Sequence, residues 1–199
     1  MDIKNHIKQR AGELLPELIR VRRHIHENPE LSFQEFETAA FVESELQALG
    51  LKTQRLANTG VVAIIEGKNP SKKVVGLRAD MDALPIVEVS DGREYRSKKE
   101  GVMHACGHDV HTTSLLGAAK LLTELKDQFE GSVKLVFQPG EEKLPGGASL
   151  MIADGVLENP KIDVMIGQHV MPGIETGKTG FRAGLYMAST DEIYIKVIG

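Results

Sequence analysis

Tryptophan is absent from this sequence, and cysteine occurs only once among its 199 residues. A single cysteine excludes an intramolecular disulfide, and the charged start at residues 1–6 lacks the apolar core of a signal peptide. We therefore expect a reducing, cytoplasmic setting. Apolar runs of the roughly twenty residues that span a bilayer are also missing, so we expect no membrane partner.

An excess of charge of one sign is missing as well. The chain has 24 Lys and Arg against 28 Asp and Glu, which gives a formal net charge of -4. Because no basic surface is indicated, we do not expect binding to nucleic acid. Hydrophobic residues make up 41% of the chain, which is enough to form the core of a globular protein.

Periodic apolar residues predict an alternation of helices and strands. Helical spacing predicts a first helix from Ile3 that ends before Pro29, and Ser32 with Glu35 matches a capping box for a second helix that runs to Gly50. Strands are predicted at residues 51–56, 61–66, 74–78, 133–137 and 162–167, and helices at residues 109–129, with Asp109 as N-cap, and 147–157. This order predicts an α/β sheet covered by helices on both faces.

Five polar residues lie just beyond the carboxyl ends of three different predicted strands. They are Asp80, Asp82, Glu141, Glu142 and His169. The ligand crevice of an open α/β sheet forms at this edge, so we expect these side chains to converge on one site.

The stretch from Met103 to Asp109 contains the only cysteine, two histidines and a carboxylate. These side-chain types bind borderline-soft divalent metals. The candidate ligands in the whole chain are Cys106, His108, Glu142 and His169. A thiolate suits zinc, whereas imidazoles and carboxylates would equally accept manganese or cobalt, so the identity of the ion stays open.

Glu141 and Glu142 form an adjacent pair of acids. Because neighbouring side chains diverge from an extended backbone, we expect one acid to bind metal while the other acts on water. A metal lowers the pKa of bound water towards about 7, and a nearby carboxylate can take its proton and pass it to a leaving amine. The chemistry predicted from these residues is amide hydrolysis.

Four motifs in order then resemble one family. They are HENPELS at residues 26–32, LRADMDALP at 77–85, MHACGHD at 103–109 and FQPGEE at 137–142. Together they resemble the amidohydrolase branch of the aminoacylase and carboxypeptidase metallopeptidases, which includes hippurate hydrolases, indoleacetyl-amino-acid hydrolases and acetyl-diaminopimelate deacetylases. The similarity runs through essentially the whole chain.

The resemblance implies a centre of two divalent metal ions, zinc or manganese, with cobalt or nickel as alternatives. The ligand positions of the family match Cys106, His108, Glu142 and His169. The general base matches Glu141, and Asp82 matches an aspartate that orients the centre, with Asp80 as a second candidate for that role. His26, His104 and His111 are expected in structural or supporting positions.

The resemblance also implies a three-layer α/β/α metallopeptidase catalytic domain that is incomplete in this chain. Residues 1–185 are the expected amino-terminal part, and residues 186–199 the first strand of an inserted α+β lid and dimerisation domain. Family members are about twice as long, so we expect a fragment, and a homodimer at full length. Many relatives have Ala in place of Gly140 and glycines in place of residues 143–145, so the loop beside the base is altered.

The expected reaction is hydrolysis of N-acyl amino acids or small peptide-like amides by a metal-activated water. One alternative is a cysteine hydrolase with Cys106 as nucleophile and His108 or His169 as base. Another is a noncatalytic metal-binding fragment, because the lid and a final histidine ligand of the family are not in this sequence.

Overall fold

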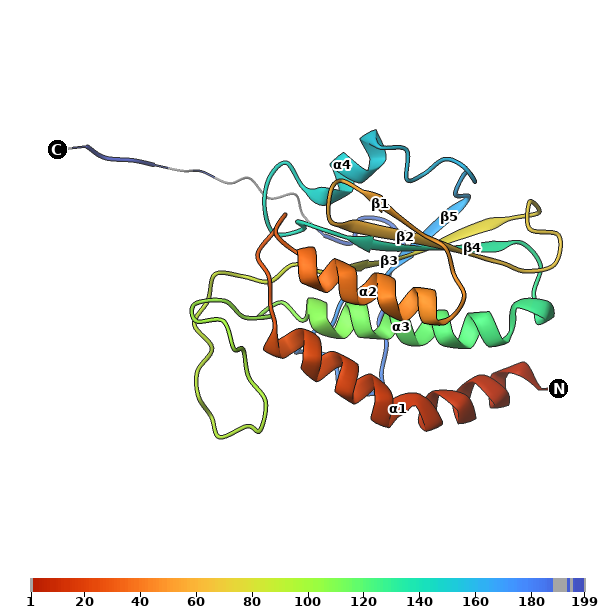
Figure 1. Cartoon of the computed structure of the whole chain (residues 1–199), viewed down its shortest axis with the longest axis horizontal. Coiled ribbons are helices and arrows are strands. Elements are labelled where there is room, and N and C mark those ends of the chain that lie inside the picture. Colours follow the sequence, from red (N-terminus) through yellow and green to blue (C-terminus); the bar gives the residue numbers. More distant parts are fainter. Residues whose placement is uncertain (1, 188–192, 194, 199) are drawn as a thin grey trace.

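The computed structural model describes residues 2–187, 193 and 195–198, and its centre is a five-stranded mixed sheet in the order β1-β2-β4-β3-β5 (Figure 1). The strands are β1 (Thr53–Leu56), β2 (Gly60–Glu66), β3 (Val74–Asp80), β4 (Ser132–Gln138) and β5 (Val164–Gly167). β2 pairs antiparallel with both β1 and β4, whereas β3, β4 and β5 run parallel to one another. The carboxyl ends of these three parallel strands therefore lie at one edge of the sheet.

Helices lie on both faces of the sheet (Figure 1). They are α1 (Ile3–Glu27), α2 (Phe36–Ala48), α3 (His108–Glu124) and α4 (Gly147–Ala153), with a short 3-10 turn η1 (Lys126–Gln128) after α3. α2 and α3 pack against the sheet, α1 packs against α3 from outside, and α4 lies on the opposite face. The predicted three-layer α/β/α arrangement is confirmed.

The side chains of β2 alternate between the two faces of the sheet, which explains how both faces are covered. Val61 and Ile65 are buried in the cluster that includes residues of α2 and α3. Val62 points to the other face, where Met151 of α4 is buried in the same cluster. Successive strand residues face opposite sides, so this apolar run fills both cores at once.

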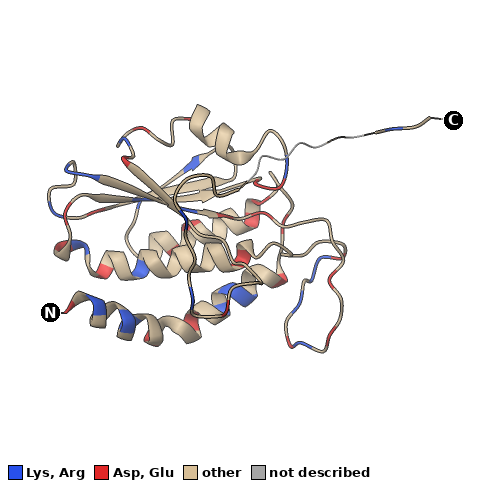
Figure 2. Ribbon diagram, turned by 180° about the vertical axis from the view of Figure 1, so that it is seen from behind, with Lys and Arg blue, Asp and Glu red and all other residues tan. Residues whose placement is uncertain are grey.

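Charged residues tie the helices together outside the core. Figure 2 shows basic and acidic segments interspersed along α1. Arg10 of α1 pairs with Glu124 of α3 at 2.9 Å, and Lys120 of α3 pairs with Glu17 of α1 at 2.8 Å and with Glu45 of α2 at 3.1 Å. Lys120 thus links three helices, and because its ammonium is largely shielded from solvent these pairs are less screened than ordinary surface pairs.

Two predictions about helix starts are wrong. Glu35 is the N-cap residue of α2 but makes no capping bond, and Ser32 Oγ donates to Asp82 Oδ2 at 2.6 Å instead. The N-cap residue of α3 is Gly107, while Asp109 lies in the first turn and accepts a hydrogen bond from His26. Ser32 and Asp109 each form a hydrogen bond with a residue that is distant in sequence instead of capping a helix. Local sequence patterns do not reveal such partners.

The chain between β3 and α3 makes a long excursion and then returns. Leu84 and Met103 form an antiparallel bridge that closes the intervening loop, visible below and to the left of the sheet in Figure 1. This closure brings the segment that carries Cys106 back beside the end of β3.

In residues 2–187, 193 and 195–198, no helix combines the length and the apolar character needed to cross a membrane. The strand predicted at residues 186–199 falls partly on residues 188–192, 194 and 199, which lie outside the described residues, so that strand and the domain boundary before it stay predictions.

We expect Gly147→Ala to destabilise the fold by about 1–3 kcal/mol or more, because a β-carbon there would lie 1.6 Å from the backbone oxygen of Pro139. Gly12→Ala is the matched control, since no atom lies within 4 Å of the added carbon. It removes a glycine from the interior of α1 and should stabilise the fold by about 0.5–1 kcal/mol. Urea unfolding of both variants checks the opposite signs, and equal effects would contradict this packing at the start of α4.

Candidate metal centre

Cys106 and His108 lie on either side of Gly107 at the start of α3. Gly107 has a φ of +87°, in the left-handed region, and a β-carbon there would lie 2.3 Å from Val170 Cγ2. Only glycine fits this turn without strain. The turn lets one sulfur and one imidazole face the same side of the loop.

The imidazole of His108 is fully buried and has acids on both sides. Its Nδ1 lies 3.3 Å from Asp82 Oδ1, so we assign the ring proton to Nδ1 and the lone pair to Nε2. Nε2 faces three carboxylate oxygens, of Asp80 at 3.6 Å, Glu142 at 3.7 Å and Glu141 at 4.0 Å. A carboxylate behind the imidazole and a free Nε2 in front is the usual arrangement of a metal-binding histidine.

Cys106 and His169 meet beside this imidazole. Cys106 Sγ lies 3.4 Å from His169 Nε2, although the two residues are separated by 63 positions. His169 Nδ1 donates to the backbone oxygen of Val170 at 2.6 Å, which leaves its Nε2 lone pair pointing at the sulfur. Cys106 Sγ, a nitrogen of His108 and a nitrogen of His169 lie within 4.8 Å of one another.

Glu141 and Glu142 do not diverge as expected, because the chain after β4 bends instead of continuing as a strand. Both carboxylates reach the Nε2 side of His108 and form a second group of close donors with it. They differ in exposure: the side chain of Glu141 is 41% exposed and that of Glu142 22%. Glu141 is thus the acid more open to water.

Asp82 connects three parts of the centre. Its Oδ1 faces His108, while its Oδ2 accepts hydrogen bonds from Ser32 Oγ at 2.6 Å and from the backbone N–H of Glu142 at 3.0 Å. Burial opposes ionisation of Asp82, but the hydrogen bonds from His108 and Ser32 outweigh it and lower its pKa. One buried carboxylate therefore orients a histidine and fixes the loop that carries the acid pair.

Asp80 plays a parallel part for His111. His111 Nδ1 lies 2.6 Å from Asp80 Oδ1, and His111 Nε2 accepts the backbone N–H of Val170 at 2.9 Å. Both ring nitrogens are thus engaged, so His111 supports the segment of His169 rather than offering a free ligand atom. Burial opposes ionisation of Asp80, yet the hydrogen bond of His111 and the charge of Arg78 hold its pKa at about 2.

The acids create a strongly negative environment at the centre. Burial raises the pKa of Glu141, and the adjacent charge of Glu142 raises it further. Burial also raises the pKa of the Cys106 thiol to about 12, with Glu142 and Glu141 acting in the same direction. A thiolate is therefore disfavoured here unless a cation offsets the acids.

The donor set fits a divalent cation. His108 Nε2 and Glu142 Oε1 are buried and have no hydrogen-bond partner within the described part of the chain, although they face each other. Unpaired buried polar atoms are costly unless something else satisfies them. Sulfur, imidazole and carboxylate are donors that zinc sites combine, and the imidazoles and carboxylates would also accept manganese.

Sequence reasoning missed a second buried network, beside the centre. His26 Nδ1 lies 2.8 Å from Asp109 Oδ2 and its Nε2 lies 2.9 Å from Glu88 Oε1, while Arg22 Nε pairs with Asp109 at 2.8 Å. The hydrogen bond with Asp109 raises the pKa of His26 despite its burial. This network fixes the first turn of α3, next to His108, against α1. Arg22 and Glu88 lie outside the four motifs and gave no local signal.

His104 is also buried, but neither of its ring nitrogens has a hydrogen-bond partner among the residues that the structure describes. Burial lowers its pKa to about 4, so the ring is neutral. His26, His104 and His111 are thus all interior side chains around the centre, as expected for structural positions, although the partners of His26 were not predicted.

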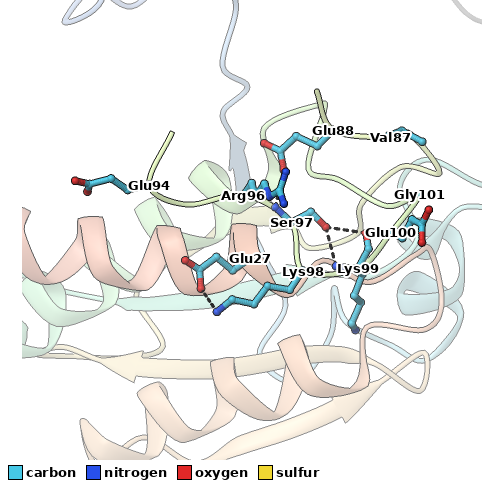
Figure 3. Close-up of a pocket in the computed structure, with 10 residues that line it drawn as sticks. All are labelled: Glu27, Val87, Glu88, Glu94, Arg96, Ser97, Lys98, Lys99, Glu100 and Gly101. Atoms are coloured by element: carbon cyan, nitrogen blue, oxygen red, sulfur yellow. Dashed lines mark hydrogen bonds and ion pairs between the residues drawn. The ribbon is translucent and has the colours of Figure 1, made fainter. Parts of the chain in front are cut away.

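A hollow of about 570 Å³ lies between the end of α1 and the loop that follows β3 (Figure 3). Its walls carry charges of both signs, with an ion pair between Glu27 and Lys98. None of the predicted site residues lines it. Glu88, which bonds His26, is the wall residue that connects this hollow to the network beside the centre.

Comparisons with known proteins identify relatives of this chain. The N-acyl-L-amino acid amidohydrolase of Geobacillus stearothermophilus is 46% identical over 197 residues, which cover 98% of this chain and 52% of the relative. The hippurate hydrolase of Campylobacter jejuni is 47% identical, with 94% of this chain and 49% of the relative covered. The chain thus spans about half the length of the curated relatives it matches.

A solved structure from Bacillus subtilis, titled a dinuclear metal-binding peptidase of the M20 family, has a TM-score of 0.76 and 39% identity, covering 81% of this chain and 44% of that one. The family model for peptidase family M20/M25/M40 matches residues 76–196. The resemblance deduced from the four motifs is confirmed: the chain belongs to peptidase family M20/M25/M40.

Proposed function

We propose that this chain supplies the metal centre of an enzyme that hydrolyses the amide bond of N-acyl amino acids or small peptide-like amides. The observation that carries the proposal is the pairing of His108 Nε2 with Glu142 Oε1, two buried and otherwise unbonded donors 3.7 Å apart, beside Cys106 and His169. The names of the amidohydrolase relatives support the substrate class.

In this proposal the metal ligands are Cys106, His108, Glu142 and His169. His108 belongs to three groups of close ligand atoms, one with Cys106 and His169, one with Glu141 and Glu142, and one with Asp80 and His111. The dinuclear relative supports a centre of two divalent ions. Zinc or manganese is the proposed metal, with cobalt or nickel as substitutes. When bound, such ions lower the pKa of water and polarise an amide carbonyl.

The protein side chains divide the remaining work. Glu141 is the more exposed acid and has a raised pKa, so it suits a general base that takes a proton from the attacking water and returns it to the departing amine. Asp82 holds the proton on His108 Nδ1 and anchors the backbone of Glu142. Both tasks keep donors in place while charge develops on the substrate.

A cysteine hydrolase is the second candidate, because Cys106 Sγ lies 3.4 Å from a histidine nitrogen. The surrounding acids count against it, since they disfavour a thiolate.

We also propose a cytoplasmic setting, which keeps a lone thiol reduced, and a homodimer for a chain of the relatives' full length.

Hydrolysis of an N-acyl amino acid, assayed with a protein extended to the relatives' length, should vanish in chelator and return with zinc or manganese. A thiol alkylator should leave the metal-loaded enzyme active, because the sulfur is occupied as a ligand. Survival in chelator with loss to the alkylator would instead favour the cysteine nucleophile. We expect the 199-residue chain alone to turn over poorly, because it spans about half the length of its relatives, and a rate equal to that of the extended protein would contradict this expectation.

Cys106→Ala and His108→Ala should each lose transition metal from the purified protein, because each removes a ligand. His24→Ala is the matched control, since His24 is an exposed histidine of α1. Elemental analysis after dialysis against zinc gives the stoichiometry, and circular dichroism checks the fold. Full metal content in either ligand variant would contradict the proposed ligand set.

Glu141→Gln should lower kcat by about 10²–10⁴-fold while leaving the metal content unchanged, because it removes the base and keeps the shape. Glu37→Gln, which changes an exposed glutamate of α2, is the control and should keep the parent rate. Loss of metal in Glu141→Gln would reassign Glu141 as a ligand.

A further inference from the structure

Glu35 is a buried acid outside the proposed ligand set. Its relative exposure is 0%, and its carboxylate accepts three hydrogen bonds. Oε1 accepts the backbone N–H of Phe33 at 2.9 Å and that of Gly140 at 2.7 Å, while Oε2 accepts Thr59 Oγ1 at 2.7 Å. This carboxylate therefore joins three separate segments of the chain.

The location of Glu35 is not explained by the helix it begins. Glu35 is the N-cap residue of α2, yet its side chain makes no capping bond to that helix. Burial raises its pKa, which shows that the site is costly for a charge. The carboxylate of Glu35 does not cap its own helix but binds Gly140, which is 105 positions away. This contact points to a role at Gly140.

Gly140 belongs to the loop that carries the acid pair. Gly140 directly precedes Glu141 and Glu142, and a β-carbon on Gly140 would lie 2.3 Å from the ring of Phe33, so this loop is pressed against the segment of Glu35. The backbone oxygen of Gly140 accepts the N–H of Gly147 at 2.8 Å, which closes the loop before α4.

Two buried carboxylates thus hold alternate amides of this loop. Glu35 binds the N–H of Gly140, and Asp82 binds the N–H of Glu142 at 3.0 Å. Glu141 lies between these two anchors. Displacement of either anchor would move both acids relative to His108, and a metal ligand or base displaced by about 1 Å loses much of its effect.

We propose that Glu35 is a positioning residue that fixes the backbone of Gly140–Glu142 and so places Glu142 to bind metal and Glu141 to act on water. The second part rests on the proposed function of the centre. The first part, the anchoring of the loop, stands on the hydrogen bonds alone.

Three variants separate positioning from stability. Glu35→Ala removes all three hydrogen bonds. Glu35→Gln keeps an oxygen for the two backbone N–H groups and turns its NH₂ towards the Thr59 hydroxyl, which can accept. Leu46→Ala deletes a fully buried side chain at the other end of α2 and lowers stability without touching the loop.

Hydrogen exchange of the metal-free 199-residue chain tests the anchoring directly. Glu35→Ala should speed exchange of the amides of residues 140–142 by about tenfold or more, as expected for the loss of a buried hydrogen bond. In Glu35→Gln the amides of residues 140–142 should exchange at the parent rate. In Leu46→Ala their exchange should not increase more than that of amides elsewhere in the chain. Parent-like protection of residues 140–142 in folded Glu35→Ala would overturn the proposal.

Cobalt binding, followed by the thiolate and ligand-field absorption of Co²⁺, tests the consequence for the centre. Glu35→Ala should weaken Co²⁺ binding by about tenfold or more, Glu35→Gln should stay near the parent, and Leu46→Ala should remain within about twofold. Equal weakening in Leu46→Ala would reduce the effect to stability and overturn the positioning role.

If the parent chain itself binds no Co²⁺, the proposed function fails, while hydrogen exchange still decides whether Glu35 anchors the loop. If Glu35→Ala does not fold, Glu35→Asp replaces it, because its carboxylate is withdrawn by one methylene from Gly140. Parent-like exchange of residues 140–142 in Glu35→Asp would then overturn the proposal.

Discussion

The orientation of the His108 ring is the constraint on which the centre depends. Asp82 lies 3.3 Å from its Nδ1, so its Nε2 is turned towards the acid pair and kept free of other partners in the described structure. The same carboxylate holds the N–H of Glu142. A single buried acid thereby sets the relative position of two proposed ligands, which is how supporting groups tune metal sites.

Strand order explains why these groups meet although they are far apart in sequence. β3, β4 and β5 are parallel, and their register sets Asp80 level with Gln138 and Arg78 level with Gly167. The residues that follow these strands must then emerge at one edge. The loop closed by Leu84 and Met103 returns the chain to the same edge and delivers Cys106 and His108. The helices and core serve to hold this edge together.

The fold and most of the site could be read from the sequence because each carries a local signal. Period and turn residues marked the helices and strands, and polar residues after strands marked the edge. The contacts that were predicted wrongly or not predicted are long-range. Ser32 donates a hydrogen bond to Asp82 instead of capping a helix, and Glu35 accepts one from Gly140. His26 pairs with two distant acids. No periodicity encodes a hydrogen bond between residues that are 50 to 105 positions apart.

The most direct test of the account is anomalous diffraction from crystals of this chain grown with zinc. The account predicts zinc peaks bonded to His108 Nε2 and Glu142 on one side and close to Cys106 Sγ and His169 Nε2 on the other, at about 2.0–2.3 Å from their ligand atoms. Peaks confined to exposed histidines, or a metal-free centre in which His108 turns away from Glu142, would contradict it.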